Sequence, residues 1–312
     1  MRKPRFITGV VLAVAAIAGG LSSARAQQAS SFGVPVHVVV TVEPRHGSNV
    51  PVINSEDVMV YQGRDRAKVM DWIPLQGERA GLQLFILIDD AASTSLGSQL
   101  EDVRQFINAQ PSTTAIGVAY MRNGTAEILQ NPTNDHTQAA KALRLPLGDP
   151  GGSGSPYFSL VDLIKRWPEG PVRREILMVS DGIDRFGGNG PSNPYVDSAI
   201  EEAQRAAVII YSIYTPGVGH YGHSFWRMNW GQNYLSQLSD ETGGEAYYLG
   251  FGAPVSFAPY LDDLSHRLTR QYLLTFLAKP ERKGGFQQFK LRTEVPNAEL
   301  VAADRVYVPA GT

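Results

Sequence analysis

The chain has 312 residues, with 28 basic and 30 acidic residues, a net charge of −2 and no cysteine. The lack of cysteine excludes disulfides and a bacterial lipid anchor, so stability must come from a buried core, which a chain of this length can form. Charge this balanced, without a block of one sign, argues against a nucleic-acid ligand.

The first 26 residues have the layout of a secretory signal peptide. Arg2, Lys3 and Arg5 form a basic start, residues 6–21 are apolar, and residues 24–26 (Ala-Arg-Ala) fit the A-x-A cleavage pattern. The apolar stretch is short for a membrane span, and a retained anchor is the alternative. We expect an exported protein, periplasmic or extracellular, without stable membrane insertion. Four basic residues lie in the leader, so its removal lowers the net charge from −2 to −6.

Two sections, residues 27–80 and 271–312, are predicted as accessory β segments. Strands are expected at 34–42, 58–61 and 68–74, and again at 272–278, 286–294 and 300–308. Isolated hairpins are only marginally stable. The two sections should therefore pack together or each add to the sheet of the region between them.

Residues 81–270 alternate between strand and helix. Strands are expected at 84–88, 115–121, 125–130, 175–180, 207–214 and 245–249, and helices at 99–109, 135–145, 160–167, 196–207, from 233, and at 259–270. This alternation is typical of an α/β fold with a doubly wound, mostly parallel sheet.

Two of these apolar strands end abruptly in aspartate. Residues 84–88 run into Asp89 and Asp90, and residues 176–180 run into Asp181. Uninterrupted apolar runs suit strands buried on both faces, and open α/β sheets bind ligands at the carboxyl ends of such strands. Carboxylates with the nearby hydroxyl of Ser93 suit Mg²⁺ or Ca²⁺ better than zinc. The alternative is a purely structural role, in which the aspartates cap strand–helix turns and bind no ion.

Five short motifs in order resemble one protein family. They lie at residues 55–63, 84–93, 177–182, 241–244 and 271–274. With the leader in front, the chain resembles a von Willebrand factor A (VWA) domain protein of the exported, VWA-related group abundant in Acidobacteria. The resemblance covers nearly all of the chain after the leader.

The resemblance implies a metal-ion-dependent adhesion site. Such sites combine a D-x-S-x-S motif, a threonine from a later loop and the aspartate of a D-G turn around an ion that takes an acidic residue from a partner protein. Here Ala91 replaces the first serine, so one hydroxyl ligand is missing. The implied ligands for Mg²⁺, or for Mn²⁺ or Ca²⁺, are Asp89, Ser93 and Asp181, with Ser153 or Ser155 from the loop and Asp90 as an auxiliary.

A second cluster lies between residues 216 and 231. His220 and His223 could form a metal pair, but no acidic partner is near in sequence, and a surface loop is the simpler reading. The large rings of this segment would either anchor an interface or cover their own domain; they are Tyr221, Phe225, Trp226 and Trp230.

No catalytic pattern is present in the sequence. Residues 152–155 (Gly-Ser-Gly-Ser) are not a G-x-S-x-G nucleophile elbow, and the histidines have no motif placement. We therefore expect a non-enzymatic binding protein whose protein partner presents a carboxylate. The alternatives are a metal-free structural interaction domain and an enzyme that acts on cell-envelope polymers.

Overall fold

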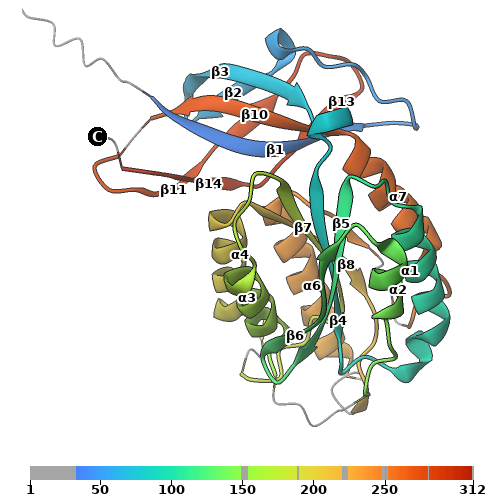
Figure 1. Ribbon diagram of the computed structural model, residues 1–312. Coiled ribbons are helices and arrows are strands. Elements are labelled where there is room, and N and C mark those ends of the chain that lie inside the picture. Colours follow the sequence, from blue (N-terminus) through green and yellow to red (C-terminus); the bar gives the residue numbers. More distant parts are fainter. Residues whose placement is uncertain are drawn as a thin grey trace, which may run out of the picture. The chain divides into compact units, whose positions relative to one another are not determined.

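The computed structural model describes residues 33–310, apart from 149–153, 188–189, 220–223, 248–249, 251 and 280. The described residues belong to one compact unit, which contains two six-stranded sheets and one two-stranded sheet (Figure 1). The predicted signal peptide at 1–26, the candidate ligand Ser153 and the pair His220 and His223 lie outside the described residues.

The central region forms a mostly parallel sheet. Its strands, in spatial order, are β6 (Thr125–Thr133), β5 (Thr114–Arg122), β4 (Leu82–Asp89), β7 (Arg173–Ser180), β8 (Val208–Tyr214) and β9 (Ala246–Tyr247). All neighbours pair in parallel except β5 and β6, which form a hairpin. The predicted mixed α/β fold is confirmed.

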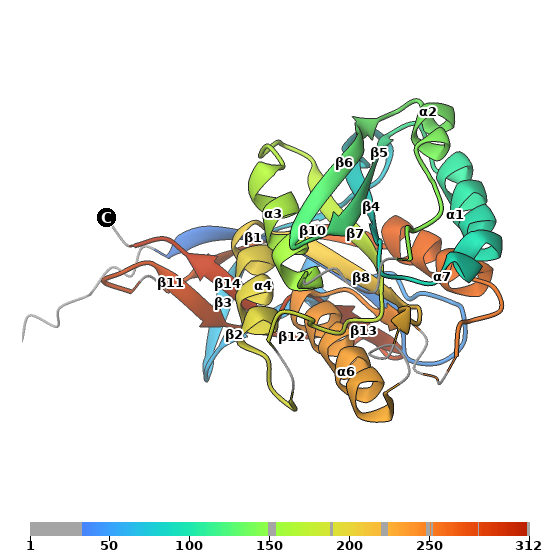
Figure 2. The same ribbon diagram turned by 90° about the horizontal axis from the view of Figure 1, so that it is seen from below.

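Helices cover both faces of this sheet (Figure 2). The α1 (Gly97–Ala109), α2 (His136–Lys141) and α7 (Ala258–Thr269) helices share a buried core with the Leu84 face of β4. The Phe85 face of the same strand shares a second core with α3 (Pro156–Arg166), α4 (Pro194–Arg205) and α6 (Phe225–Thr242). The alternation along β4 follows from the two-residue period of a strand. Two apolar faces explain why β4 is an uninterrupted apolar run.

The other large sheet is antiparallel and contains strands from both ends of the chain. Its order is β12 (Lys290–Arg292), β2 (Met59–Gln62), β3 (Asp65–Pro74), β10 (Gln271–Ala278), β1 (Val34–Pro44) and β13 (Ala298–Val301). A small separate sheet pairs β11 (Gly285–Gln288) with β14 (Arg305–Val308). The doubly wound arrangement therefore holds for the central region only, and the two accessory segments pack together.

Three predicted elements differ from the structure. Residues 300–308 are not one strand but parts of β13 and β14, which belong to different sheets. Residues 286–294 are likewise divided between β11 and β12. The helix expected from residue 233 is α6, which already begins at Phe225. None of the described helices is long and apolar enough to cross a membrane.

Polar side chains connect the antiparallel sheet to the α/β region. Arg267, near the end of α7, forms ion pairs with Glu43 of β1, with Asp263 at 2.6 Å and with Glu245 at 3.0 Å. The side-chain amide of Gln271, the first residue of β10, donates to the Tyr211 hydroxyl at 3.2 Å. These contacts fix the base of the central sheet, which is the end opposite the candidate site.

Candidate functional site

Asp89 and Asp181 lie at the same rim of the central sheet. Asp89 is the last residue of β4, and Asp181 directly follows β7, its parallel neighbour, with Ile88 opposite Val179. The two carboxylates are almost fully buried, with exposed fractions of 5% and 1%. The apolar strands therefore bring both aspartates to the carboxyl rim, as the sequence predicts.

Both carboxylate oxygens of Asp89 are hydrogen-bonded. Oδ1 accepts the backbone N–H of Ala91 at 2.9 Å, and Oδ2 accepts the Ser180 hydroxyl at 2.7 Å. Burial, followed by repulsion from Asp181, raises the pKa of Asp89 from 3.8 to about 6, although the charge of Arg185 opposes the rise. Repulsion between two buried carboxylates is relieved by a nearby positive charge or by protonation of one of them.

Arg185 supplies that charge. Its Nη2 lies 2.5 Å from Asp181 Oδ2, and its Nη1 donates to Asp181 Oδ1 and to the carbonyl oxygen of Ile183, both at 3.2 Å. The Arg185 side chain is only 5% exposed. Burial lowers the pKa of Arg185, but the attraction of Asp181 and Asp89 outweighs it and the pKa is raised, so the guanidinium is charged.

Two of the other predicted ligands, Asp90 and Ser93, bind other protein groups. Asp90 forms a two-pronged ion pair with Arg144, at 2.6 and 2.8 Å, and accepts the N–H of Leu147 at 3.2 Å. The Ser93 hydroxyl accepts hydrogen bonds from the backbone N–H and the hydroxyl of Ser95, at 3.2 and 2.9 Å, where it caps a short 3₁₀ turn. In this arrangement the oxygens of Asp90 and Ser93 accept hydrogen bonds from protein groups, and their role as ion ligands stays a prediction.

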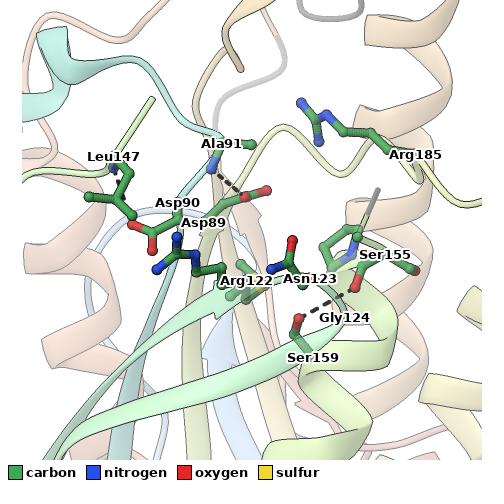
Figure 3. Close-up of a pocket in the computed structure, with 13 residues that line it drawn as sticks. Asp89, Asp90, Ala91, Arg122, Asn123, Gly124, Leu147, Ser155, Ser159 and Arg185 are labelled. Atoms are coloured by element: carbon green, nitrogen blue, oxygen red, sulfur yellow. Dashed lines mark hydrogen bonds between the residues drawn. The ribbon is translucent and has the colours of Figure 1, made fainter. Parts of the chain in front are cut away.

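Ser155 is the one loop hydroxyl of the prediction that the structure describes, and it faces a pocket. It directly precedes α3, is 1% exposed, and its Oγ has no hydrogen-bond partner in the part of the chain that the structure describes. The pocket, here called the rim pocket, has a volume of about 420 Å³ including open solvent. Its polar lining consists of Asp89, Asp90, Arg122, Asn123, Ser155, Ser159 and Arg185 (Figure 3).

Asp89 and Asp90 lie on one side of the rim pocket with the Arg122 side chain beside them, Arg185 and Ser155 lie on the other side, and Asn123 lies between them (Figure 3). Arg122 and Asn123, at the β5–β6 turn, are exposed, whereas Ser155 and Arg185 are buried. Within the described ranges, the Arg185 Nε also lacks a hydrogen-bond partner. The pocket lining thus combines an exposed cation, Arg122, with buried donors on Ser155 and Arg185.

A divalent cation does not fit these residues in this arrangement. Magnesium requires near-octahedral oxygen coordination, but the oxygens of Asp89, Asp181 and Asp90 already accept hydrogen bonds from protein groups. Within the described ranges there is no group of three or more histidine, aspartate or glutamate residues that could hold a metal ion. The adjacent guanidinium of Arg185 would also repel a cation.

Sequence reasoning missed the two arginines that hold the aspartates. Arg185 follows Asp181 by four residues and Arg144 lies far from Asp90 in sequence, so only the first had a local signal. A further buried carboxylate was missed as well. Asp184 is fully buried and accepts the N–H of Phe186 at 2.8 Å and the side-chain amide of Asn193 at 3.0 Å.

No protein-family model matches the chain, and no curated protein matches it in sequence. Among solved structures, a von Willebrand factor type A protein from Catenulispora acidiphila matches 90% of this chain and 75% of its own, at 9% identity and a TM-score of 0.44. The vWF domain of a type V pilus tip protein from Porphyromonas gingivalis matches 60% of this chain and 94% of its own, at 11% identity and a TM-score of 0.42. An aerotolerance-related membrane protein from Bacteroides fragilis matches 60% and 98%, at 14% identity and a TM-score of 0.41.

The chain resembles VWA domains. At these identities the likeness concerns the fold, and no function follows from it. In the VWA-like region, residues 82–269, the carboxyl rim holds the two aspartates of the expected motif. At this rim the Arg185 guanidinium binds Asp181.

Proposed function

We propose that this protein is a non-enzymatic binding protein, and that the rim pocket of its VWA-like region receives an acidic side chain from a partner protein. The observation that carries the proposal is a pair of buried donors on residues that line the pocket, Ser155 Oγ and Arg185 Nε, which have no hydrogen-bond partner among the described residues. Buried polar groups are nearly always hydrogen-bonded, so donors without a partner beside a pocket favour a ligand that accepts from them.

The charges around these donors favour a carboxylate. Arg122 and Arg185 both line the pocket, Arg122 as an exposed residue and Arg185 as a buried, charged one. The α3 helix begins directly after Ser155. A helix N-terminus carries a partial positive charge that attracts anions. Asp89 lies in the same pocket, but its two oxygens already accept hydrogen bonds from Ala91 and Ser180.

We also propose that the protein works outside the cytoplasm. Support comes from the basic start, the apolar stretch and the Ala-Arg-Ala sequence within residues 1–26. Mass determination of the N-terminus after expression in a bacterial host tests this, and an intact Met1 in the exported fraction would contradict cleavage after Ala26.

Selection of peptides from a random display library tests the pocket. We expect the selected peptides to share an aspartate or glutamate, and its replacement by the amide should weaken binding at least tenfold, or about 1.4 kcal/mol. Ser155→Ala and Arg122→Ala should weaken binding to a similar degree. Ser155→Ala should disturb the folded protein little, because the Ser155 hydroxyl has no hydrogen-bond partner among the described residues.

The matched control is Arg282→Ala, which removes an exposed positive charge from a turn outside the rim pocket. It should leave peptide affinity unchanged. Peptides without a shared acidic residue, or peptides that bind all variants equally well, would contradict the proposal.

A further inference from the structure

The rim contains buried carboxylates whose charge a side chain of the same protein neutralises. Asp89 and Asp181 are both buried at this rim, and the charge of Asp181 raises the cost of ionising Asp89. A buried carboxylate pair without a cation would be strongly unfavourable. Among the described residues, Arg185 is the group that binds Asp181 with both of its terminal nitrogens.

The surrounding backbone leaves room for this guanidinium. A Cβ added to Gly217 would lie 2.0 Å from Asp181 Oδ2 and 2.5 Å from Arg185 Nη2. Both distances are too short for any side chain. The Ile183 carbonyl accepts from Arg185 Nη1 at 3.2 Å on the other side. The ion pair is therefore held between two backbone segments.

Two features of the adhesion-site segment agree with this arrangement. Position 91 carries a methyl group in place of a hydroxyl, and the Ser93 hydroxyl accepts hydrogen bonds from Ser95. Neither oxygen is needed where no metal has to be coordinated. Arg144 neutralises Asp90 in a similar way, at 2.6 and 2.8 Å.

We infer that Arg185 takes the place of the divalent cation at this rim. Its guanidinium then neutralises the buried aspartates, and the site binds its ligand without a metal ion. The inference deepens the proposed function, and where that function holds, Arg185 is the charge that meets the partner's carboxylate. Its test uses small cations and needs no partner, so the two ideas can fail separately.

Manganese titration and thermal unfolding of the wild type and three variants test the inference. The wild type should bind no Mn²⁺ at the rim and show no change in Tm with MnCl₂ or methylguanidinium. Arg185→Ala leaves Asp181 buried without its partner, so its Tm should fall, and either added cation should raise it by several degrees through binding to the folded state. The double variant Asp181→Asn/Arg185→Ala should recover stability and lose the response to both cations.

Three results would overturn the inference. The first is Mn²⁺ binding by the wild type that Asp181→Asn abolishes. The second is a folded Arg185→Ala protein whose Tm responds to neither cation. The third concerns the case in which Arg185→Ala does not fold. The double variant should then fold, because it no longer buries Asp181 as an unpaired carboxylate. A double variant that is no more stable than Arg185→Ala would contradict the inference.

Discussion

At the scale of single residues, Asp90 is more deeply buried than its ion-pair partner Arg144. The loss of stability on mutation should therefore differ between the two residues. The Asp90 side chain is 4% exposed, whereas that of Arg144 is 31% exposed and stacks over the Tyr120 ring at 3.9 Å. Removing the arginine strands a buried carboxylate, but removing the carboxylate leaves an arginine that water can reach. The loss of one partner is costly mainly when the other stays buried.

We therefore predict that Arg144→Ala costs about 3 kcal/mol of unfolding free energy. Asp90→Asn, which can still accept the Leu147 N–H, should cost about 1 kcal/mol. Urea denaturation of both variants measures the difference. Equal costs, or a larger cost for Asp90→Asn, would show that the pair is not organised around a buried carboxylate.

Gly217 gives a second prediction at this scale. Gly217→Ala places a methyl group against Asp181 and Arg185, and we expect a loss of about 1–3 kcal/mol from overpacking. The matched control is Gly170→Ala, because a Cβ there has no neighbour within 4 Å. That control should change stability by less than about 0.5 kcal/mol. Similar losses in both variants would mean that the close approach at Gly217 is not the cause.

At the scale of elements, the strands that lead to the site were predictable and the start of α6 was not. The run at 84–88 became β4 (Leu82–Asp89) because its residues are apolar on both faces. Gly231 reads as a breaker in the sequence, but in α6 its missing side chain allows close packing: an added Cβ would lie 2.2 Å from the Asp181 carbonyl oxygen. Periodicity alone does not distinguish a glycine that ends a helix from one that packs it closely.

The sequence also did not predict which arginine pairs with each aspartate of the site. The aspartates could be placed at one rim from their positions after strands, because parallel strands share their direction. The arginine that binds each aspartate depends on how loops return to the rim, and Arg144 comes from the segment after α2. Apolar patterns decide which face of a strand is buried and leave the pairing of charges open.

Glu175 of β7 gives a prediction about pH at the junction of the two large sheets. Its carboxylate is fully buried, 3.5 Å from Arg173 Nε, and burial raises its pKa above 4.5 despite the attraction of that arginine. The folded protein thus holds this proton more tightly than the unfolded chain does. Stability from this group is present below about pH 4.5 and is lost as pH rises through the higher folded-state value.

Accordingly, the stability of the wild type relative to Glu175→Gln should fall as the pH rises from 4.5. Denaturation of both proteins across the acidic to neutral range measures the difference, in which effects common to both chains cancel. A difference that does not change with pH, or that grows in favour of the wild type, would contradict a raised pKa for Glu175.

At the scale of the whole molecule, the antiparallel sheet and the VWA-like region share a polar junction and should unfold together. Phe276 of β10 is fully buried in the core of the antiparallel sheet. We expect Phe276→Ala to cost about 3–5 kcal/mol. Hydrogen exchange should then become faster in β7 and β8 as well as in β1 and β10. Faster exchange confined to the antiparallel sheet would show two independent units.

The strand order of the antiparallel sheet has a consequence for how the chain is made. The β1 strand pairs with β10 and β13, which are formed by residues 271–278 and 298–301. Synthesis therefore produces β1 near the beginning and its neighbours near the end. Until then the buried valines of this strand, Val36, Val38 and Val40, have no native place to pack. Because such distant pairings close slowly, the fold can be completed only after nearly all of the chain has left the ribosome.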